Sequence, residues 1–328
     1  MQTTLRCPRH VPSMAIATVT SLWLAGCEAP LNLEAVQATA SQATRRTDFY
    51  QAMARNPSVI VVAGNDGVLL SSRDDGQTWT RHTDLSDSSF LAIDTCPDQS
   101  FVALTFDNHV WHGNASANQW VPTPLPSQEQ MMTVACSPEG NWVAAGSFTT
   151  IQYSSDQGQS WQEISLYEDA ILNNLQFLDQ NQAIATGEYG LVLASDDGGE
   201  HWAIAGHAPD DFYIHTSHFT SPQEGWVGGL NGFIYHTRDG ARSWTRVPVQ
   251  TSAPVFGFVP GDDTLYALAD NATVLKLEDG VWVQVSQSDR PIYLKSGLLL
   301  PNQRLLVAGG HGLLFALKPA MTETTGNL

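Results

Sequence analysis

SSRDDGQTW, at residues 71–79, recurs three more times along this chain and decides how it folds. Written as S-x-D-x-G-x-x-W, the motif is complete in three copies, whereas the fourth has Thr for Ser and Ala241 at the glycine position, with Gly240 one place early. The four copies comprise Ser72, Asp74, Gly76 and Trp79; Ser154, Asp156, Gly158 and Trp161; Ser195, Asp197, Gly199 and Trp202; and Thr237, Asp239 and Trp244. Asp can bond the backbone amides of its own turn, Gly accepts a positive φ, and Trp buries a large ring. We call this motif the Asp box and predict that each copy is a structural hairpin turn, not a binding site.

The indoles set a period of about 40 residues. Intervals of 41, 41, 41, 42 and 38 residues separate Trp79, Trp120, Trp161, Trp202, Trp244 and Trp282. Seven apolar segments share the same spacing, and each has an aliphatic residue at one aligned position: Leu69, Val110, Ile151, Val192, Ile234, Val274 and Leu314. Units of this length with four short strands are typical of propeller blades.

We therefore predict an all-β, seven-bladed β-propeller with four-stranded antiparallel blades over residues 48–318. The last unit has no outer strand of its own. We expect the N-terminal segment to supply this strand and close the ring, which would leave no open sheet edge.

The N-terminus has the pattern of an export signal. Residues 1–26 carry Arg6 and Arg9 before a short apolar run, and Leu24-Ala25-Gly26-Cys27 looks like the lipobox of bacterial lipoproteins. We predict lipidation of Cys27, a tether over residues 27–47 whose LNLEAVQAT stretch could instead pair as an edge strand, and a loose tail at 319–328. An ordinary signal peptide is the alternative. By the same resemblance to bacterial lipoproteins, Glu28 directly after the cysteine favours an anchor in the outer membrane, with the protein facing the periplasm.

The chain is strongly acidic, with a formal net charge of −18. Without residues 1–26 it would hold 13 Lys and Arg against 33 Asp and Glu. Such a surface repels nucleic acid and anionic headgroups, so we expect membrane association through the lipid anchor only. We expect a monomeric propeller whose protein partner offers a basic or neutral face.

Two cysteines, Cys96 and Cys136, remain in the repeat region and lie 40 residues apart, at similar positions of adjacent units. An exported protein permits a disulfide between them. Inner strands of neighbouring blades could be too far apart for that bond, so the spacing favours two buried thiols and leaves both states open.

No catalytic residue, cofactor or metal site emerges from the sequence. Asp-box repeats occur in sialidases, but Arg73, Arg81, Arg238, Arg242 and Arg246 fall beside the Asp boxes, and the early Arg-Ile-Pro signature is missing. The pairs His109/His112 and His215/His218 would face opposite sides of a strand, which favours isolated surface or turn histidines over a metal site. Acid pairs such as Asp210-Asp211 fall in predicted turns, with a calcium site as the alternative.

The lipobox, the Asp-box units and the recurring A-G-x-x-G strands together resemble the photosystem II stability/assembly factor family over residues 48–318. The resemblance implies a non-enzymatic assembly chaperone that holds a membrane protein through a basic patch. This chain departs there, because it shows no Arg cluster, and relatives also occur in bacteria that do not photosynthesise. We therefore expect an envelope lipoprotein that acts as a scaffold for a membrane protein complex other than photosystem II. The alternative is a carbohydrate-binding or sialidase-like propeller.

Overall fold

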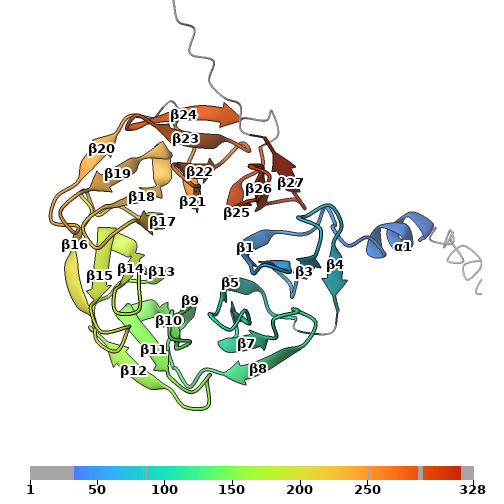
Figure 1. Cartoon of the computed structure of the whole chain (residues 1–328), viewed down its shortest axis with the longest axis horizontal. Coiled ribbons are helices and arrows are strands. Elements are labelled where there is room, and N and C mark those ends of the chain that lie inside the picture. Colours follow the sequence, from blue (N-terminus) through green and yellow to red (C-terminus); the bar gives the residue numbers. More distant parts are fainter. Residues whose placement is uncertain (1–32, 84, 86, 250, 287–290, 319–328) are drawn as a thin grey trace, which may run out of the picture. The chain divides into compact units, whose positions relative to one another are not determined.

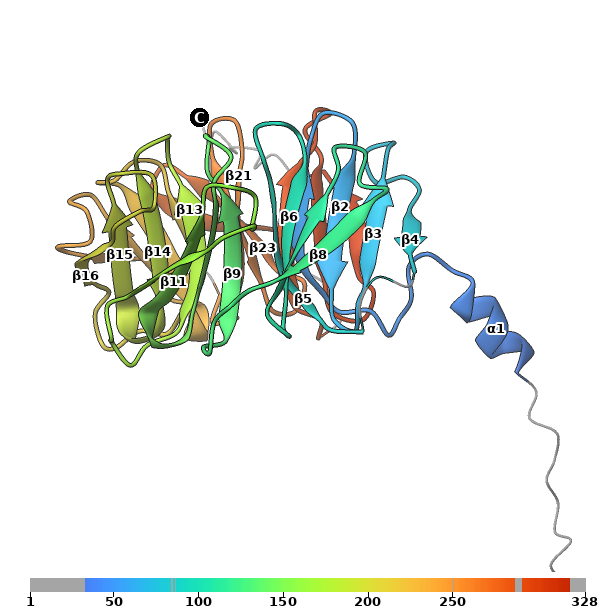
Figure 2. The same cartoon turned by 90° about the horizontal axis from the view of Figure 1, so that it is seen from below.

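Seven β-sheets form a closed ring in the computed structural model, which describes residues 33–83, 85, 87–249, 251–286 and 291–318. Figure 1 looks down the axis of the ring, and Figure 2 shows from the side that the strands run between its two faces. Consecutive strands of each sheet pair in antiparallel order. The predicted seven-bladed propeller is confirmed.

Each blade begins at the axis and ends at the rim. The first strands are β1 (Tyr50–Arg55), β5 (Phe90–Thr95), β9 (Met131–Cys136), β13 (Leu172–Phe177), β17 (Ile214–Phe219), β21 (Val255–Pro260) and β25 (Leu294–Leu299). The second strands are β2 (Ile60–Gly64), β6 (Phe101–Thr105), β10 (Trp142–Gly146), β14 (Ala183–Gly187), β18 (Gly225–Gly229), β22 (Leu265–Ala269) and β26 (Leu305–Gly309). The third strands are β3 (Leu69–Ser72), β7 (His109–Gly113), β11 (Thr150–Ser154), β15 (Leu191–Ser195), β19 (Ile234–Thr237), β23 (Val274–Glu278) and β27 (Leu314–Leu317). The outer strands are β4 (Thr80–His82), β8 (Trp120–Pro124), β12 (Gln162–Ser165), β16 (Ala203–His207), β20 (Thr245–Val247) and β24 (Val281–Ser286).

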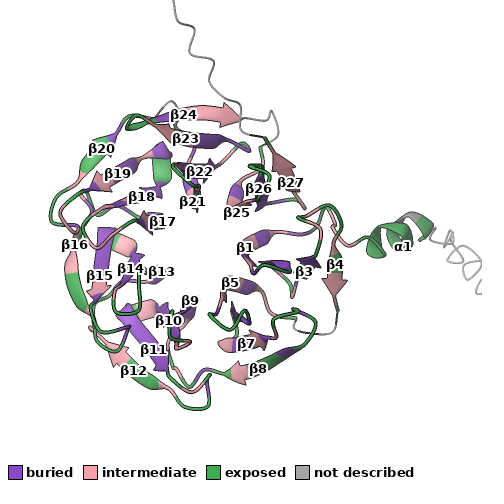
Figure 3. Ribbon diagram, viewed as in Figure 1, coloured by how far each residue is buried: buried purple, intermediate pink, exposed green. Residues whose placement is uncertain are grey.

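The core lies between blades. Second strands such as β10 (WVAAG) and β22 (LYALA) are buried along their whole length (Figure 3), because a neighbouring sheet covers each face. One apolar cluster fills each joint; at the joint of blades 1 and 2, for example, Val61 packs with Ala103. Burial on both faces explains why the second strands are nearly continuous runs of apolar residues.

The prediction that an N-terminal strand completes the seventh blade is wrong for the described residues. Six blades have four strands, and the seventh consists of β25, β26 and β27. The ring closes instead as its other joints do: Leu306 of blade 7 packs with Leu70 of blade 1, and the Gly312 amide donates to the Asp48 carbonyl at 2.7 Å. Within the part of the chain that the structure describes, packing between sheets closes the ring without an added strand.

A helix stands where a tether or edge strand was predicted. Glu34–Ala40 forms α1, with the sequence EAVQATA. Ala, Glu and Gln favour helix, and the short segment has no alternating apolar face that would require a strand. Among the described residues, no helix has both the length and the apolar character that a membrane crossing needs.

The ring has two different faces. One carries the connections between successive blades and the turns between the second and third strands, and we call it the connection face. Hydrogen bonds join these segments: the Ser147 amide donates to the Gln130 carbonyl at 2.9 Å, and the Glu188 amide to the Ile171 carbonyl at 3.0 Å. Three of these turns are η1 (Ser147–Thr149), η2 (Glu188–Gly190) and η3 (Leu230–Gly232), and the central residue of each has a positive, non-helical φ. The Asp boxes, which join third and outer strands, lie on the opposite face.

Candidate functional site

Each Asp box is a self-contained hydrogen-bonded turn. In the first copy the Ser72 hydroxyl donates to Asp74 Oδ1 at 2.8 Å and accepts the Gly76 amide at 2.9 Å. Asp74 also accepts the Thr78 amide at 2.9 Å and the Thr78 hydroxyl at 2.6 Å. These hydrogen bonds, led by the Thr78 hydroxyl, lower the pKa of Asp74 to about 2. Both carboxylate oxygens are thus engaged within the turn.

The other three boxes repeat this geometry. Ala241, which replaces glycine in the fourth copy, adopts φ 66° and donates its amide to the Thr237 hydroxyl at 3.0 Å. Sequence reasoning missed one member, the residue just before the Trp, whose amide bonds the aspartate in every copy: Thr78, Ser160, His201 and Ser243. Its recurrence as Thr or Ser in three copies is the signal that could have revealed it.

The periodic indoles occupy the joints between blades. Each packs into the apolar cluster that its blade shares with the preceding one: Trp161 joins blades 2 and 3, and Trp202 joins blades 3 and 4. Trp120 and Trp282 are buried, whereas the four Asp-box indoles are half-buried. The boxes therefore place rings that hold neighbouring sheets together.

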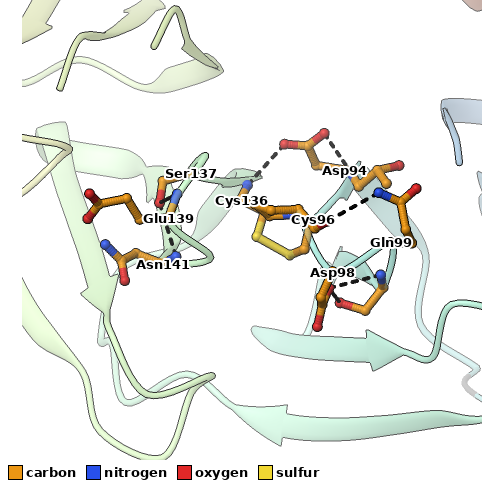
Figure 4. Close-up of a disulfide and its surroundings, with 11 residues drawn as sticks. Asp94, Cys96, Asp98, Gln99, Cys136, Ser137, Glu139 and Asn141 are labelled. Carbon is orange, nitrogen blue, oxygen red and sulfur yellow. Dashed lines mark hydrogen bonds between the residues drawn. A yellow bond between two sulfur atoms is a disulfide. The ribbon is translucent and has the colours of Figure 1, made fainter. Parts of the chain in front are cut away.

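Cys96 and Cys136 form a disulfide, which corrects the preference for free thiols (Figure 4). Their Cα atoms are 5.2 Å apart because the first strands of blades 2 and 3 converge near the axis. Beside the bond, Asp94 accepts the Cys136 amide at 3.0 Å and the Thr95 amide at 2.8 Å. The disulfide and the contact from the Cys136 amide fasten blade 2 to blade 3, whereas the Thr95 contact lies within blade 2.

A central cavity of about 860 Å³, lined by all seven first strands, is the candidate site. Every first strand has a β-bulge at its second residue, next to the connection face. Bulges redirect side chains and are frequent beside binding sites. The bulged residues all line the cavity, and we call them the bulge ring: Gln51, Leu91, Met132, Asn173, His215, Phe256 and Lys295.

One side of the bulge ring is aromatic and carries a single ammonium. His215 stacks on Phe256 with centroids 5.2 Å apart, and Tyr213 meets His215 edge-on at 5.3 Å. Burial lowers the pKa of Lys295, and burial followed by the Lys295 charge lowers the pKa of His215. Among the described residues, the Lys295 side chain has no hydrogen-bond or ion-pair partner. This side of the ring can accept an anionic or hydrogen-bonding group of a ligand.

The cavity wall holds one carboxylate, Asp94, among its described residues. Burial raises its pKa to about 6, while both oxygens accept main-chain amides. Cleavage by paired carboxylates needs a second acid across the scissile bond. The wall is therefore better suited to recognition than to glycoside hydrolysis.

Several polar residues lie elsewhere than the sequence suggested. His112, His215 and His218 were expected in turns or on the surface, but they belong to β7 and β17, and burial lowers the pKa of His215 and His218. No group of three or more His, Cys, Asp or Glu side chains that could hold a metal occurs among the described residues. Cys27, the predicted lipidation site, lies outside the described residues.

Sequence comparisons confirm the resemblance. The sequence model of a family described as "Photosynthesis system II assembly factor YCF48" matches residues 157–262, about a third of the chain. A protein named "Photosystem II assembly lipoprotein Ycf48", from Synechococcus sp. (strain CC9902), is 32% identical over 97 residues, which cover 29% of each chain. The matches to curated relatives span between 29% and 56% of those relatives' lengths.

Solved structures share the whole propeller at low identity. A structure described as "YCF48 bound to D1 peptide" has a TM-score of 0.66 and 18% identity, and the alignment covers 83% of this chain and 93% of that one. An enzyme, virginiamycin B lyase from Staphylococcus aureus, has a TM-score of 0.70 and 10% identity, with 83% and 94% coverage. Because both identities are so low, these likenesses support the fold and do not separate assembly factors from enzymes.

Proposed function

We propose, from its resemblance to photosystem II assembly proteins, that this propeller is a non-catalytic assembly or stability factor that holds a membrane protein or complex. The observation that carries the proposal is the family match over residues 157–262, which spans the end of blade 3, blades 4 and 5, and the start of blade 6. The cavity wall agrees with it, because it offers amides, aromatic rings and one ammonium instead of paired carboxylates. We infer a client other than photosystem II, since the sequence shows no Arg cluster like the basic patch that the family resemblance implies.

The proposed location is the cell envelope. In this proposal residues 1–26 direct export, Cys27 carries the lipid, residues 27–47 tether the propeller at 48–318, and residues 319–328 are a tail. One relative is named a lipoprotein, and the Cys96–Cys136 disulfide suits an oxidising compartment such as the periplasm. We propose an outer-membrane anchor, with a monomeric propeller that faces the periplasm.

Affinity purification from detergent-solubilised envelopes tests the function. We expect one membrane protein or complex to copurify with the wild-type chain, and its abundance to fall when the gene is deleted. Cys27→Ser should release the chain from the membrane fraction and weaken that association. Hydrolysis of a sialoside or lyase activity by the purified protein, with no copurifying membrane protein, would refute the proposal.

A further inference from the structure

Charge is unevenly distributed along the chain. Residues 82–237 hold 19 Asp and Glu with no Lys or Arg, whereas the rest of the chain holds 14 Asp and Glu with all 15 Lys and Arg. This stretch runs from the end of β4 to the end of β19. Blades 2, 3 and 4 and most of blade 5 therefore form an acidic half that attracts cationic segments.

Large apolar side chains are exposed on the connection face of the same half. Four of them stand in the turns between second and third strands of blades 2 to 5, and the fifth in the connection from blade 3 to blade 4. We call this set the apolar arc: Phe106 (55% exposed), Phe148 (51%), Tyr189 (55%), Leu230 (47%) and Tyr167 (90%). Exposed apolar side chains on consecutive blades are a feature of docking surfaces.

Three members of the apolar arc hold an unfavourable backbone conformation. Phe148 has φ 52°, Tyr189 has φ 54° and Tyr167 has φ 59°, in the left-handed region that bulky residues rarely adopt. At the turn position of Phe148 and Tyr189, blades 1, 5, 6 and 7 also have positive φ but use polar residues, namely Asp66, Asn231, Asn271 and His311. Packing does not explain the three aromatic rings, since each is at least half exposed, so the strain points to a role in binding.

Carboxylates alternate with the apolar arc. Exposed acids lie beside its members: Asp107 in the turn of Phe106, Glu168 and Asp169 next to Tyr167, and Asp210 and Asp211 in the following connection from blade 4 to blade 5. Of these, Asp107 has an ion-pair partner, His109, at 3.2 Å. The surface thus presents alternating rings and negative charges, which would repel an anionic membrane surface and match a cationic, partly apolar chain.

We propose that the apolar arc docks a segment of the partner polypeptide in which Lys or Arg alternates with large apolar side chains. The apolar side chains of the partner segment insert between the exposed side chains of the arc, and the flanking carboxylates pair with the Lys or Arg of the segment. This inference rests on the proposed function and deepens it by naming the docking face and the chemistry of the client segment.

A defined peptide tests the inference on the full-length protein in detergent. The probe is a fluorescent 16-residue peptide of alternating Arg and Leu, compared with an Asp-Leu peptide and an Arg-Ser peptide of the same length. The double variant Phe148→Asn, Tyr189→Asn should bind the Arg-Leu peptide about tenfold or more weakly. Ile204→Thr is the control, because Ile204 is 44% exposed in the same acidic half but lies on β16.

The double variant should fold normally, since Asn already occupies this turn position in blades 5 and 6. Preferential binding of the Arg-Leu peptide, lost in the double variant and kept in Ile204→Thr, supports the inference. Equal binding by all three proteins, or equal binding of the Arg-Ser peptide, overturns it. If a membrane client copurifies equally with the wild type and the double variant, the docking face is wrong and the proposed function stands. If the Arg-Leu peptide binds as expected but no client copurifies, the proposed function is wrong and the docking surface stands.

Discussion

Removing the Cys96–Cys136 disulfide should cost the propeller a large part of its stability. The bond spans a sequence separation of 40, and closing a loop of that length in the unfolded chain corresponds to roughly 4 kcal/mol. The Asp94 hydrogen bonds to Cys136 and Thr95 persist without the bond, so they do not add to the loss. We expect Cys96→Ala with Cys136→Ala to lower the free energy of unfolding by about 3–4 kcal/mol.

Urea unfolding followed by indole fluorescence measures this difference, in a chain whose other cysteines, Cys7 and Cys27, are replaced by Ser. Trp142 pairs with Cys136 across β10 and β9, so its fluorescence reports on this joint. Reductant should destabilise the parent chain by a similar amount and leave the double Ala variant unchanged. A loss below about 1 kcal/mol, or two free thiols in the unreduced native protein, would refute the reasoning.

Three further outcomes follow from the indoles at the joints, from the Asp-box residue Asp156 and from the buried Asp94. Trp282→Ala should lower the free energy of unfolding by about 3–5 kcal/mol and Trp161→Ala by about 2 kcal/mol, because Trp282 is fully buried and Trp161 is half-buried. Equal losses of stability in urea melts would contradict this difference in burial. Hydrogen bonds from Ser160 lower the pKa of Asp156 to about 2, so the stability that the ionised Asp156 contributes is present above pH 4 and is lost as the pH falls toward 2. Asp156→Asn should therefore reduce the loss of stability measured between pH 4 and pH 2. Burial raises the pKa of Asp94 to about 6, so the folded state binds a proton at a higher pH than the unfolded state does. As the pH falls from 7 to 4, the wild type should therefore gain stability relative to Asp94→Asn. A stability difference that does not change with pH would show that Asp94 ionises normally.

The sequence was sufficient to predict elements whose residues repeat. The indole period and the aligned aliphatic residues indicated seven units, and the Asp-box residues indicated the hairpins, because each of these signals is local to one blade. The prediction that an N-terminal strand closes the ring failed because the packing of Leu306 against Leu70 depends on two segments far apart in the chain. Glu34–Ala40 is too short for periodicity to separate a helix from a strand.

The candidate site could not be predicted in the same way. A bulge at Lys295 or His215 is defined by the register of the partner strand, which leaves no mark in the local sequence. The disulfide was underestimated because the convergence of first strands at the axis is a property of the assembled ring. The strained aromatics, Phe148, Tyr167 and Tyr189, could be recognised only once their backbone conformation was known.

Photocrosslinking in the living cell tests the central claim most directly, that the propeller holds a membrane client against its connection face. A photoreactive phenylalanine replaces Tyr189 in one strain and Ile204 in another, since the first lies in the apolar arc and the second on β16. We expect one membrane protein to be crosslinked to the chain from position 189 and none to be crosslinked from position 204. No adduct at position 189, or the same adducts from both positions, would contradict it.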